Sequence, residues 1–294
     1  MADAPPRRAP GGRRPSGALL GVVPFFAYTT VFLLIPTLVV LVGAFLDDDG
    51  SFTLDNLSAL SEPVVVRALR QSVVLSAVTA AVGAVLGAVL AYAVSTAKAD
   101  GVTKRFVTSL SGVLAQFGGV ALAFAFIASF GATGLISVWL RGVGVDPGTG
   151  LWLYEWNSGL MLVYLYFQVP LMLIVFLPAV EGLRPQWREA TETLGGSTWT
   201  FWRRVAGPIL FPSFVGATLL LFTNAFSAYA TAAALVSQSS PLLPLLIGGS
   251  LRSEVILGQE NVGKAMALAM IVVVAVVMTA YAWLDKRSSR WMPR

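Results

Sequence analysis

Apolar residues occur in six long runs along the chain, and shorter polar segments separate each run from the next. The runs lie near residues 18–46, 72–97, 107–130, 157–181, 209–236 and 264–284. A helix needs about 20 residues to cross a bilayer, so each run is long enough to be a membrane span. The pattern predicts an all-α, polytopic membrane protein with six transmembrane helices.

Composition supports a membrane protein and excludes several kinds of chemistry. Of the 294 residues, 56% are hydrophobic and only 12% are charged, whereas soluble domains carry about 25% charged residues. The chain has no Cys and no His. Disulfides, thiolate nucleophiles and imidazole ligands are therefore absent, and we expect no metal site in this chain.

The chain divides into a terminal tail, a first span and a core. Residues 1–16 are rich in Pro, Gly and Arg, which predicts a disordered cytoplasmic tail. Paired arginines before an apolar run could indicate an export signal, but that run exceeds the roughly 7–15 residues of a signal h-region. We expect the first transmembrane helix and an external loop in 17–71, a core of five spans with the 185–208 loop in 72–284, and a second cytoplasmic tail in 285–294.

The distribution of Lys and Arg predicts the orientation. These residues gather in the N-terminal tail, the 98–106 loop, the 182–208 loop and the C-terminal end. By the positive-inside rule those segments are cytoplasmic, so both termini are expected inside the cell. This placement also explains the net charge of +5 without a nucleic-acid partner.

Acidic residues gather in the segments that are then expected outside. They are Asp47, Asp48, Asp49, Asp55, Glu62, Asp146, Glu155, Glu254 and Glu260. Such a face would attract cations, or a binding protein with a basic rim, over about a Debye length. The alternative is that outside loops simply tolerate acids.

The second predicted span carries a small residue at every fourth position. The stripe is Thr79, Gly83, Gly87, Ala91 and Ser95. Small faces let two membrane helices approach closely, so we interpret the stripe as a packing surface rather than as a lining for solute.

The loop 185–208 is polar although it lies between two long apolar runs. Gln186–Leu194 are mostly good helix formers, Gly195 and Gly196 can end a helix, and Ser197 can cap a second one that Pro208 would stop. Apolar side chains project from both predicted helices: Trp187, Leu194, Trp199, Phe201, Trp202 and Val205. Two short helices that meet at a glycine elbow are suited to dock into a groove of another protein, although an ordinary charged loop is the alternative.

This loop resembles the EAA loop of bacterial ABC-importer permeases, whose pattern is Glu-Ala-Ala, a later Gly, and then Ile-x-Leu-Pro. Glu189, Ala190 and Thr191 stand for the triplet, and Gly195 stands for the glycine. The later part of the pattern matches at two positions, Val205 and Pro208. Thr191 and Gly207 depart from the pattern, and we expect Gly207 to end the second helix earlier.

The fifth span and the segment after it look like the permeases of the polyamine, iron and phosphonate group, and the similarity covers about 60–284. The resemblance implies a bacterial plasma-membrane subunit that pairs with an identical or related permease. It also implies two ATP-binding subunits that hold the loop and bind ATP and Mg, and an extracytoplasmic binding protein. This chain would then have no cofactor and no enzymatic activity. The docking residues would be Glu189, Ala190, Thr191, Gly195, Trp199, Phe201, Val205 and Pro208, although the aromatic ones could instead anchor the loop at the membrane interface.

Polar residues within the spans concentrate in the fifth. On a continuous helix, Asn224, Ser227 and Thr231 would share one face. We expect this face, with Tyr229, to line the translocation pathway, and Gln116 and Gln168 are secondary candidates. The alternative is that these residues form hydrogen bonds between helices and serve packing only.

The sequence also bears on the competing functions. The middle of every predicted span lacks an ionisable residue, so a proton relay is absent and energy is expected from a separate ATPase. A membrane-embedded enzyme lacks a recognisable nucleophile here, while a secondary transporter, a channel and a scaffold remain alternatives. For the cargo we expect a polyamine such as spermidine or putrescine, with 2-aminoethylphosphonate or ferric iron as alternatives and a sugar less favoured.

Overall fold

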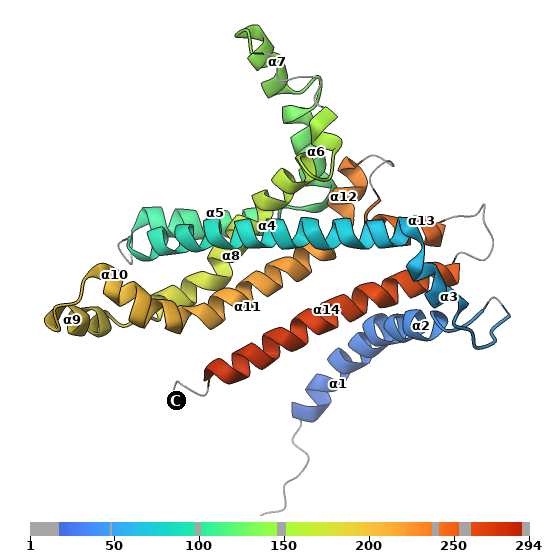
Figure 1. The fold of residues 1–294 in the computed structure, drawn as a ribbon, viewed down its shortest axis with the longest axis horizontal. Coiled ribbons are helices and arrows are strands. Elements are labelled where there is room, and N and C mark those ends of the chain that lie inside the picture. Colours follow the sequence, from blue (N-terminus) through green and yellow to red (C-terminus); the bar gives the residue numbers. More distant parts are fainter. Residues whose placement is uncertain are drawn as a thin grey trace, which may run out of the picture.

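The computed structural model describes residues 18–47, 49–97, 101–145, 151–236, 241–252 and 260–289, and most of them are helical (Figure 1). The α-helices are α1 (Ala18–Thr29), α2 (Ile35–Gly43), α3 (Asp55–Ser58), α4 (Pro63–Ser95), α5 (Val102–Gln116), α6 (Gly119–Phe130), α7 (Leu135–Gly142), α8 (Gly159–Glu181), α9 (Pro185–Thr193), α10 (Thr198–Phe201), α11 (Gly207–Phe226), α12 (Ala230–Leu235), α13 (Leu243–Arg252) and α14 (Glu260–Ser289). Two π turns, η1 (Thr30–Leu34) and η4 (Trp202–Ala206), and two 3-10 turns, η2 (Ala59–Ser61) and η3 (Leu151–Tyr154), complete the helical segments of the described chain.

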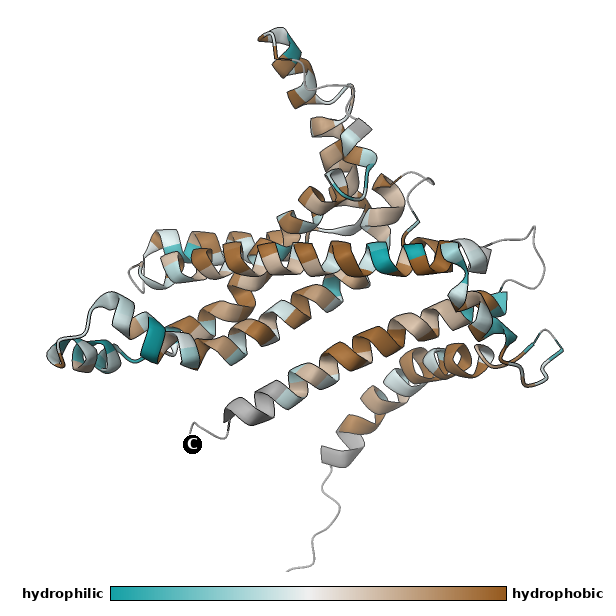
Figure 2. Ribbon diagram, viewed as in Figure 1, coloured by the Kyte–Doolittle hydropathy of each residue, from teal (hydrophilic) through white to brown (hydrophobic). Residues whose placement is uncertain are grey.

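Six segments of the described chain are long and apolar enough to cross a membrane. They are Val22–Gly43, Pro63–Ser95, Gly119–Gly142, Gly159–Glu181, Thr198–Phe226 and Glu260–Trp283. In Figure 2, apolar residues follow most of these segments, whereas hydrophilic residues gather in and around α9 and in the turns at the opposite end of the spans. The predicted all-α, polytopic fold with six transmembrane helices is therefore confirmed.

Two predicted boundaries differ from the structure. α4 begins at Pro63, so the expected boundary between 71 and 72 falls inside a continuous helix. Arg67 and Arg70 lower the hydropathy of its first turns but favour helix, and the helix therefore starts earlier than the apolar run does. At the other end α14 continues to Ser289, into the segment predicted as a tail.

The centre of the fold is the contact between α4 and α8. Thr79, Gly83, Gly87 and Ala91 of the small-residue stripe are all buried, and Ser95 at its end is half-buried. A Cβ atom on Gly87 would lie 2.4 Å from Cβ of Met172 and 2.7 Å from the carbonyl oxygen of Val169. The two helices can approach this closely only because glycine stands there, so the packing interpretation of the stripe is confirmed.

The third and fifth predicted spans are each broken. The third divides into α5 and α6 because Gly119 has φ +68°, a conformation that side-chain-bearing residues rarely adopt. In Figure 1, α6 leaves the layer of α4 and α5 and continues toward α7, away from the other helices. The fifth divides into α11 and α12, and its break includes Ser227 and Tyr229.

A proline lies two residues after the end of each π turn. Pro36 and Pro208 lack the N–H that would bond to the carbonyl four residues earlier. The residue before each proline bonds one residue further back: the N–H of Ile35 donates to Thr30, and the N–H of Gly207 donates to Trp202. The helix therefore widens and continues through the proline.

The first span packs on the last one. α2 contacts α14, and most large side chains of α1, η1 and α2 are exposed on their outer face, as expected of a lipid-facing span. The loop 185–208, which we call the docking loop, and the end of α14 lie toward one end of the spans. α3 and α13 lie toward the other end (Figure 1). The predicted tail 1–16, together with Asp48, Asp146 and Glu254 of the predicted acidic face, lies outside the described residues.

Candidate functional site

The loop between the fourth and fifth spans forms two helices that meet at a glycine elbow, as the sequence predicts. Gly195 has φ +74° and its N–H donates to the carbonyl of Glu192 at 2.9 Å. The N–H of Gly196 donates to the carbonyl of Thr191, also at 2.9 Å. These two bonds form a Schellman motif, which ends α9 and fixes the direction of the chain that follows.

The second helix starts with a side-chain cap. Ser197 has extended backbone angles, and its Oγ accepts a hydrogen bond from the N–H of Thr200 at 3.3 Å. This helix does not stop at Pro208, as the sequence had suggested, because η4 leads directly into α11. Gly207 is needed in that wide turn, since a Cβ there would lie 2.6 Å from the carbonyl oxygen of Trp202.

Most residues predicted to dock on a partner are accessible. Glu189, Ala190, Gly195, Trp199 and Pro208 are exposed, and Thr191 and Val205 are half-buried. The large apolar side chains of this loop that are most open to solvent are Leu194, at 88% exposure, and Trp199, at 72%. α9 and α10 therefore present a mixed polar and apolar surface without burying it against the rest of the described chain.

Phe201 differs from the prediction. It is buried at 8% exposure, and its neighbour Trp202 packs edge-on against Tyr92 of α4 with 5.1 Å between ring centroids. These aromatic residues hold the loop on the body of the protein and leave no surface at Phe201 for a partner. The periodicity of so short a helix could not distinguish its inward face from its outward face.

An ion pair lies at the base of the same loop. Lys104 of α5 and Glu181, the last residue of α8, are 2.6 Å apart, with side-chain exposures of 20% and 39%. The pair joins two helices just before α9 begins. Glu181 therefore belongs to the support of the docking loop.

The predicted pathway residues do not share one helical face, because the fifth span breaks between them. Asn224 and Ser227 are exposed at the end of α11, and Tyr229, in the break, lies over Gly248 of α13. Thr231 is buried in α12, where its hydroxyl donates to the carbonyl of Gly119 at 3.2 Å. The prediction of a continuous polar stripe is therefore wrong.

The two secondary candidates also differ from each other. Gln116 is exposed at the end of α5, next to the break before α6. Gln168 is fully buried between α8 and α4, and its Nε2 donates to Oγ1 of Thr79 at 2.7 Å. Gln168 thus makes the interhelical hydrogen bond that was the alternative interpretation of these residues.

The two broken spans meet, which the sequence did not predict. The hydrogen bond from Thr231 to Gly119 joins the first turn of α12 to the break between α5 and α6. The carbonyl of Ala228 accepts a hydrogen bond from the Tyr164 hydroxyl of α8 at 2.7 Å. A backbone group freed by the break is therefore paired inside the protein, as membrane burial requires. The Gly118-Gly119 pair within an apolar run was the available signal.

A groove lies beside this site. A cavity of about 830 Å³ opens beside Ser227 and Tyr229 between α2, α13 and α14, and most of its lining is apolar. Within the described ranges, acidic residues do not gather in groups of three or more that could hold a metal ion.

No family model matches the chain. It is 22% identical over 272 residues to the spermidine/putrescine transport system permease protein PotB of Haemophilus influenzae, covering 90% of this chain and 93% of that protein. It is 26% identical over 159 residues to the probable sulfate transport system permease protein cysT of Anthoceros angustus, covering 53% of this chain and 54% of that protein.

A solved structure extends the likeness to the fold. The bacterial alginate ABC transporter, crystallised with an alginate pentasaccharide-bound periplasmic protein, has a chain that aligns with a TM-score of 0.73 and 15% identity, covering 92% of this chain and 95% of that chain. The predicted resemblance is thereby confirmed: the chain is similar in sequence to transport system permease proteins and similar in fold to a chain of a bacterial ABC transporter.

Proposed function

We propose that this chain is the transmembrane subunit of an ATP-driven importer and forms half of the path for a small solute. The observation that carries the proposal is the exposed helix–glycine–helix loop, which is fixed at its base and continuous with a membrane span. The similarity to a permease along nearly the whole chain supports it. ATP and Mg would be bound by partner subunits, and this chain would catalyse no reaction.

The structure suggests how movement of the loop would reach the middle of the membrane. α10, η4 and α11 follow one another without interruption, so displacement of the loop moves α11 with it. α11 ends at the break, where Ala228 is held by Tyr164 and Thr231 is held by the backbone of Gly119. ATP-driven closure of two ATPase subunits on the loop would therefore act on both broken spans.

We place the translocation surface at these breaks. Asn224, Ser227 and Gln116 are the exposed polar side chains beside them. Transporters often use interrupted membrane helices at their binding sites, because unwound backbone is tolerated where it lines a cavity. Thr231 and Gln168 support this surface by their hydrogen bonds, and Tyr229 borders the neighbouring groove.

The remaining partners follow from the same proposal. A second permease subunit, identical or related, would complete the path, two ATP-binding subunits would hold the docking loops, and an extracytoplasmic binding protein would deliver the solute. The alginate transporter was crystallised with such a periplasmic protein. The protein would lie in a bacterial plasma membrane with both termini in the cytoplasm.

For the cargo we favour a small cation of the spermidine or putrescine type. One relative, matched over most of both chains, is a spermidine/putrescine transport system permease protein. Asp55 and Glu62 lie by α3, at the end of the spans opposite the docking loop, and Glu260 begins α14 there. 2-Aminoethylphosphonate and ferric iron are the alternatives, and a sugar is less favoured.

The glycine elbow allows a direct test with a matched control. Gly195→Val should cost about 1–2 kcal/mol, because a β-branched residue is strained at positive φ, and should lower solute uptake about tenfold. Gly144 has φ +85° and open space around it, so Gly144→Val imposes the same strain far from the loop.

Uptake and solute-stimulated ATPase activity are measured in membranes that contain the complete transporter. Loss of both in Gly195→Val and retention of both in Gly144→Val is the expected result. Normal coupling in Gly195→Val would remove the docking role from this loop. Transport by the chain in vesicles without an ATPase would instead favour a secondary transporter or channel.

A further inference from the structure

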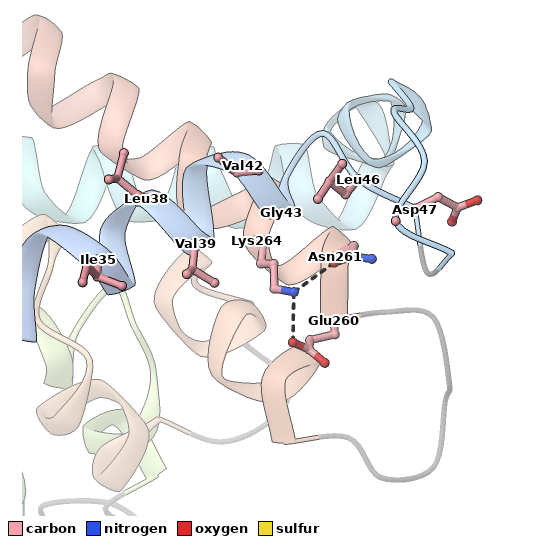
Figure 3. Close-up of a pocket in the computed structure, with 11 residues that line it drawn as sticks. Ile35, Leu38, Val39, Val42, Gly43, Leu46, Asp47, Glu260, Asn261 and Lys264 are labelled. Atoms are coloured by element: carbon pink, nitrogen blue, oxygen red, sulfur yellow. Dashed lines mark hydrogen bonds and ion pairs between the residues drawn. The ribbon is translucent and has the colours of Figure 1, made fainter. Parts of the chain in front are cut away.

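A groove runs between α2 and the start of α14, away from the predicted pathway. It encloses about 630 Å³, a size typical of small-molecule sites. The wall from α2 is apolar and consists of Ile35, Leu38, Val39, Val42 and Gly43 (Figure 3). The polar residues stand together at one end, where α14 begins.

Lys264 supplies the cation of that polar end. Its Nζ lies 3.0 Å from a carboxylate oxygen of Glu260 and 3.0 Å from Oδ1 of Asn261 (Figure 3). The Lys264 side chain is only 19% exposed, whereas that of Glu260 is 68% exposed. The ammonium group is thus drawn into the groove, while its carboxylate partner remains open at the rim.

Gly43 is the residue that admits this lysine. A Cβ atom at Gly43 would lie 2.5 Å from Cδ of Lys264, so the lysine stem passes directly against the α2 backbone. An ammonium group held inside the start of a span is costly and calls for a polar partner. Glu260, which is exposed, and Asn261, which is buried, provide part of that compensation.

The groove has the dimensions of one lipid leaflet. From Ile35 to Gly43 the helix rises roughly 12 Å at about 1.5 Å per residue. Half of the hydrocarbon thickness of a bilayer is about 15 Å. A phospholipid whose acyl chain lies along α2 would therefore place its headgroup beside Lys264 and Glu260.

We propose that this groove binds a phospholipid with a primary-amine, zwitterionic headgroup, as in phosphatidylethanolamine. The lipid phosphate would accept hydrogen bonds from Lys264, and the lipid ammonium would donate to the exposed carboxylate of Glu260. Lys264 and Glu260 together carry no net charge, and Asp47, which lines the same groove with its carboxylate directed away from Lys264, adds a negative charge (Figure 3). A lipid with net negative charge is therefore disfavoured. A choline headgroup lacks the N–H donors that Glu260 would accept.

The test measures lipid binding to the full chain, copurified with its accompanying subunits, by native mass spectrometry. Dioleoyl phosphatidylethanolamine, phosphatidylglycerol and phosphatidylcholine are added separately in detergent. The amine lipid should bind about tenfold more tightly than the other two. Lys264→Met keeps the apolar stem and should weaken binding of the amine lipid about tenfold.

Two further variants keep the result interpretable. Glu260→Gln lies at an exposed position and should abolish the preference for ethanolamine over choline without loss of folding. Lys104→Met removes a lysine of similar exposure, also paired with a glutamate, and should leave lipid binding unchanged. Equal binding of the three lipids, or unchanged binding in both Lys264→Met and Glu260→Gln, would overturn the proposal. These readouts are independent of transport and of the identity of the cargo.

Discussion

At the scale of single residues, the approach of α4 to α8 depends on Gly87. Gly87→Ala places a Cβ atom 2.4 Å from Met172 and 2.7 Å from a backbone carbonyl, so the helices must separate. We expect a loss of about 1–3 kcal/mol in the free energy of unfolding, as for other overpacked sites. Thermal unfolding in detergent would measure it.

Gly112 provides a control of opposite sign. It is also a helical glycine, but a Cβ there meets nothing within 4 Å. Gly112→Ala should therefore stabilise the protein by about 0.5–1 kcal/mol, because alanine loses less conformational entropy than glycine. Similar changes in the free energy of unfolding for Gly87→Ala and Gly112→Ala would mean that close packing at Gly87 is not what holds α4 and α8 together.

The buried pair of Thr79 and Gln168 makes a second prediction at this scale. Thr79→Val leaves Nε2 of Gln168 without its acceptor inside the membrane and should cost about 1–3 kcal/mol. Gln168→Leu should cost less, because the Thr79 hydroxyl keeps its bond to the carbonyl of Leu75, and Oε1 of Gln168 has no partner among the described residues.

Unfolding and uptake of both variants distinguish support from transport. Gln168→Leu should keep the solute specificity of uptake, because the side chain is fully buried. A changed solute specificity of uptake in Gln168→Leu would instead show that Gln168 contributes to the translocation pathway.

At the scale of elements, apolar periodicity predicted where spans occur but not where they break. The apolar pattern of a span does not change when one residue within it adopts a positive φ. The break at Gly119 therefore divides a segment that the pattern predicted as one helix. The prediction that Pro208 ends a helix was wrong for the opposite reason. The π turn η4 before this proline lets the helix continue into α11, which the residue types alone do not indicate. The Schellman elbow and the Ser197 cap were predictable, since both depend on residue type at a fixed spacing.

The ion pair between α5 and α8 tests how the docking loop is supported. Lys104→Glu places two acids together and should separate these helices just before α9, which lowers ATPase coupling. The double exchange, Lys104→Glu with Glu181→Lys, should restore it. The pairwise coupling energy in a double-mutant cycle should be below about 1 kcal/mol, because both groups are partly solvated.

Measurement of uptake against ATPase activity distinguishes this support from general stability. The expected single variant hydrolyses ATP with little uptake, while its melting temperature changes little. If the double exchange stays as uncoupled as the single variant, the charge pair is not the link between α5 and the docking loop.

At the scale of the whole molecule, sequence indicated the membrane class and the docking loop, whereas contacts between distant segments came only from the structure. Tyr164 gave no sign in the sequence that it pairs with Ala228. Burial of Phe201 likewise could not be read from the sequence, since it depends on how α10 and η4 fold back in three dimensions. Charge distribution still predicts the orientation, and that prediction can be tested on the whole chain.

The chain contains no Cys, so single cysteines can report sidedness without further changes. Leu194 on the docking loop is 88% exposed, and Phe52 at the opposite end is 73% exposed. An impermeant maleimide should label Phe52→Cys in intact cells and Leu194→Cys only after the membrane is opened, because the positive-inside rule places the arginine-rich loops in the cytoplasm. Labelling of both variants after detergent treatment is the control for reactivity. Labelling of Leu194→Cys in intact cells would place the loop outside, where a cytoplasmic ATPase could not hold it, and the proposed coupling would then fail.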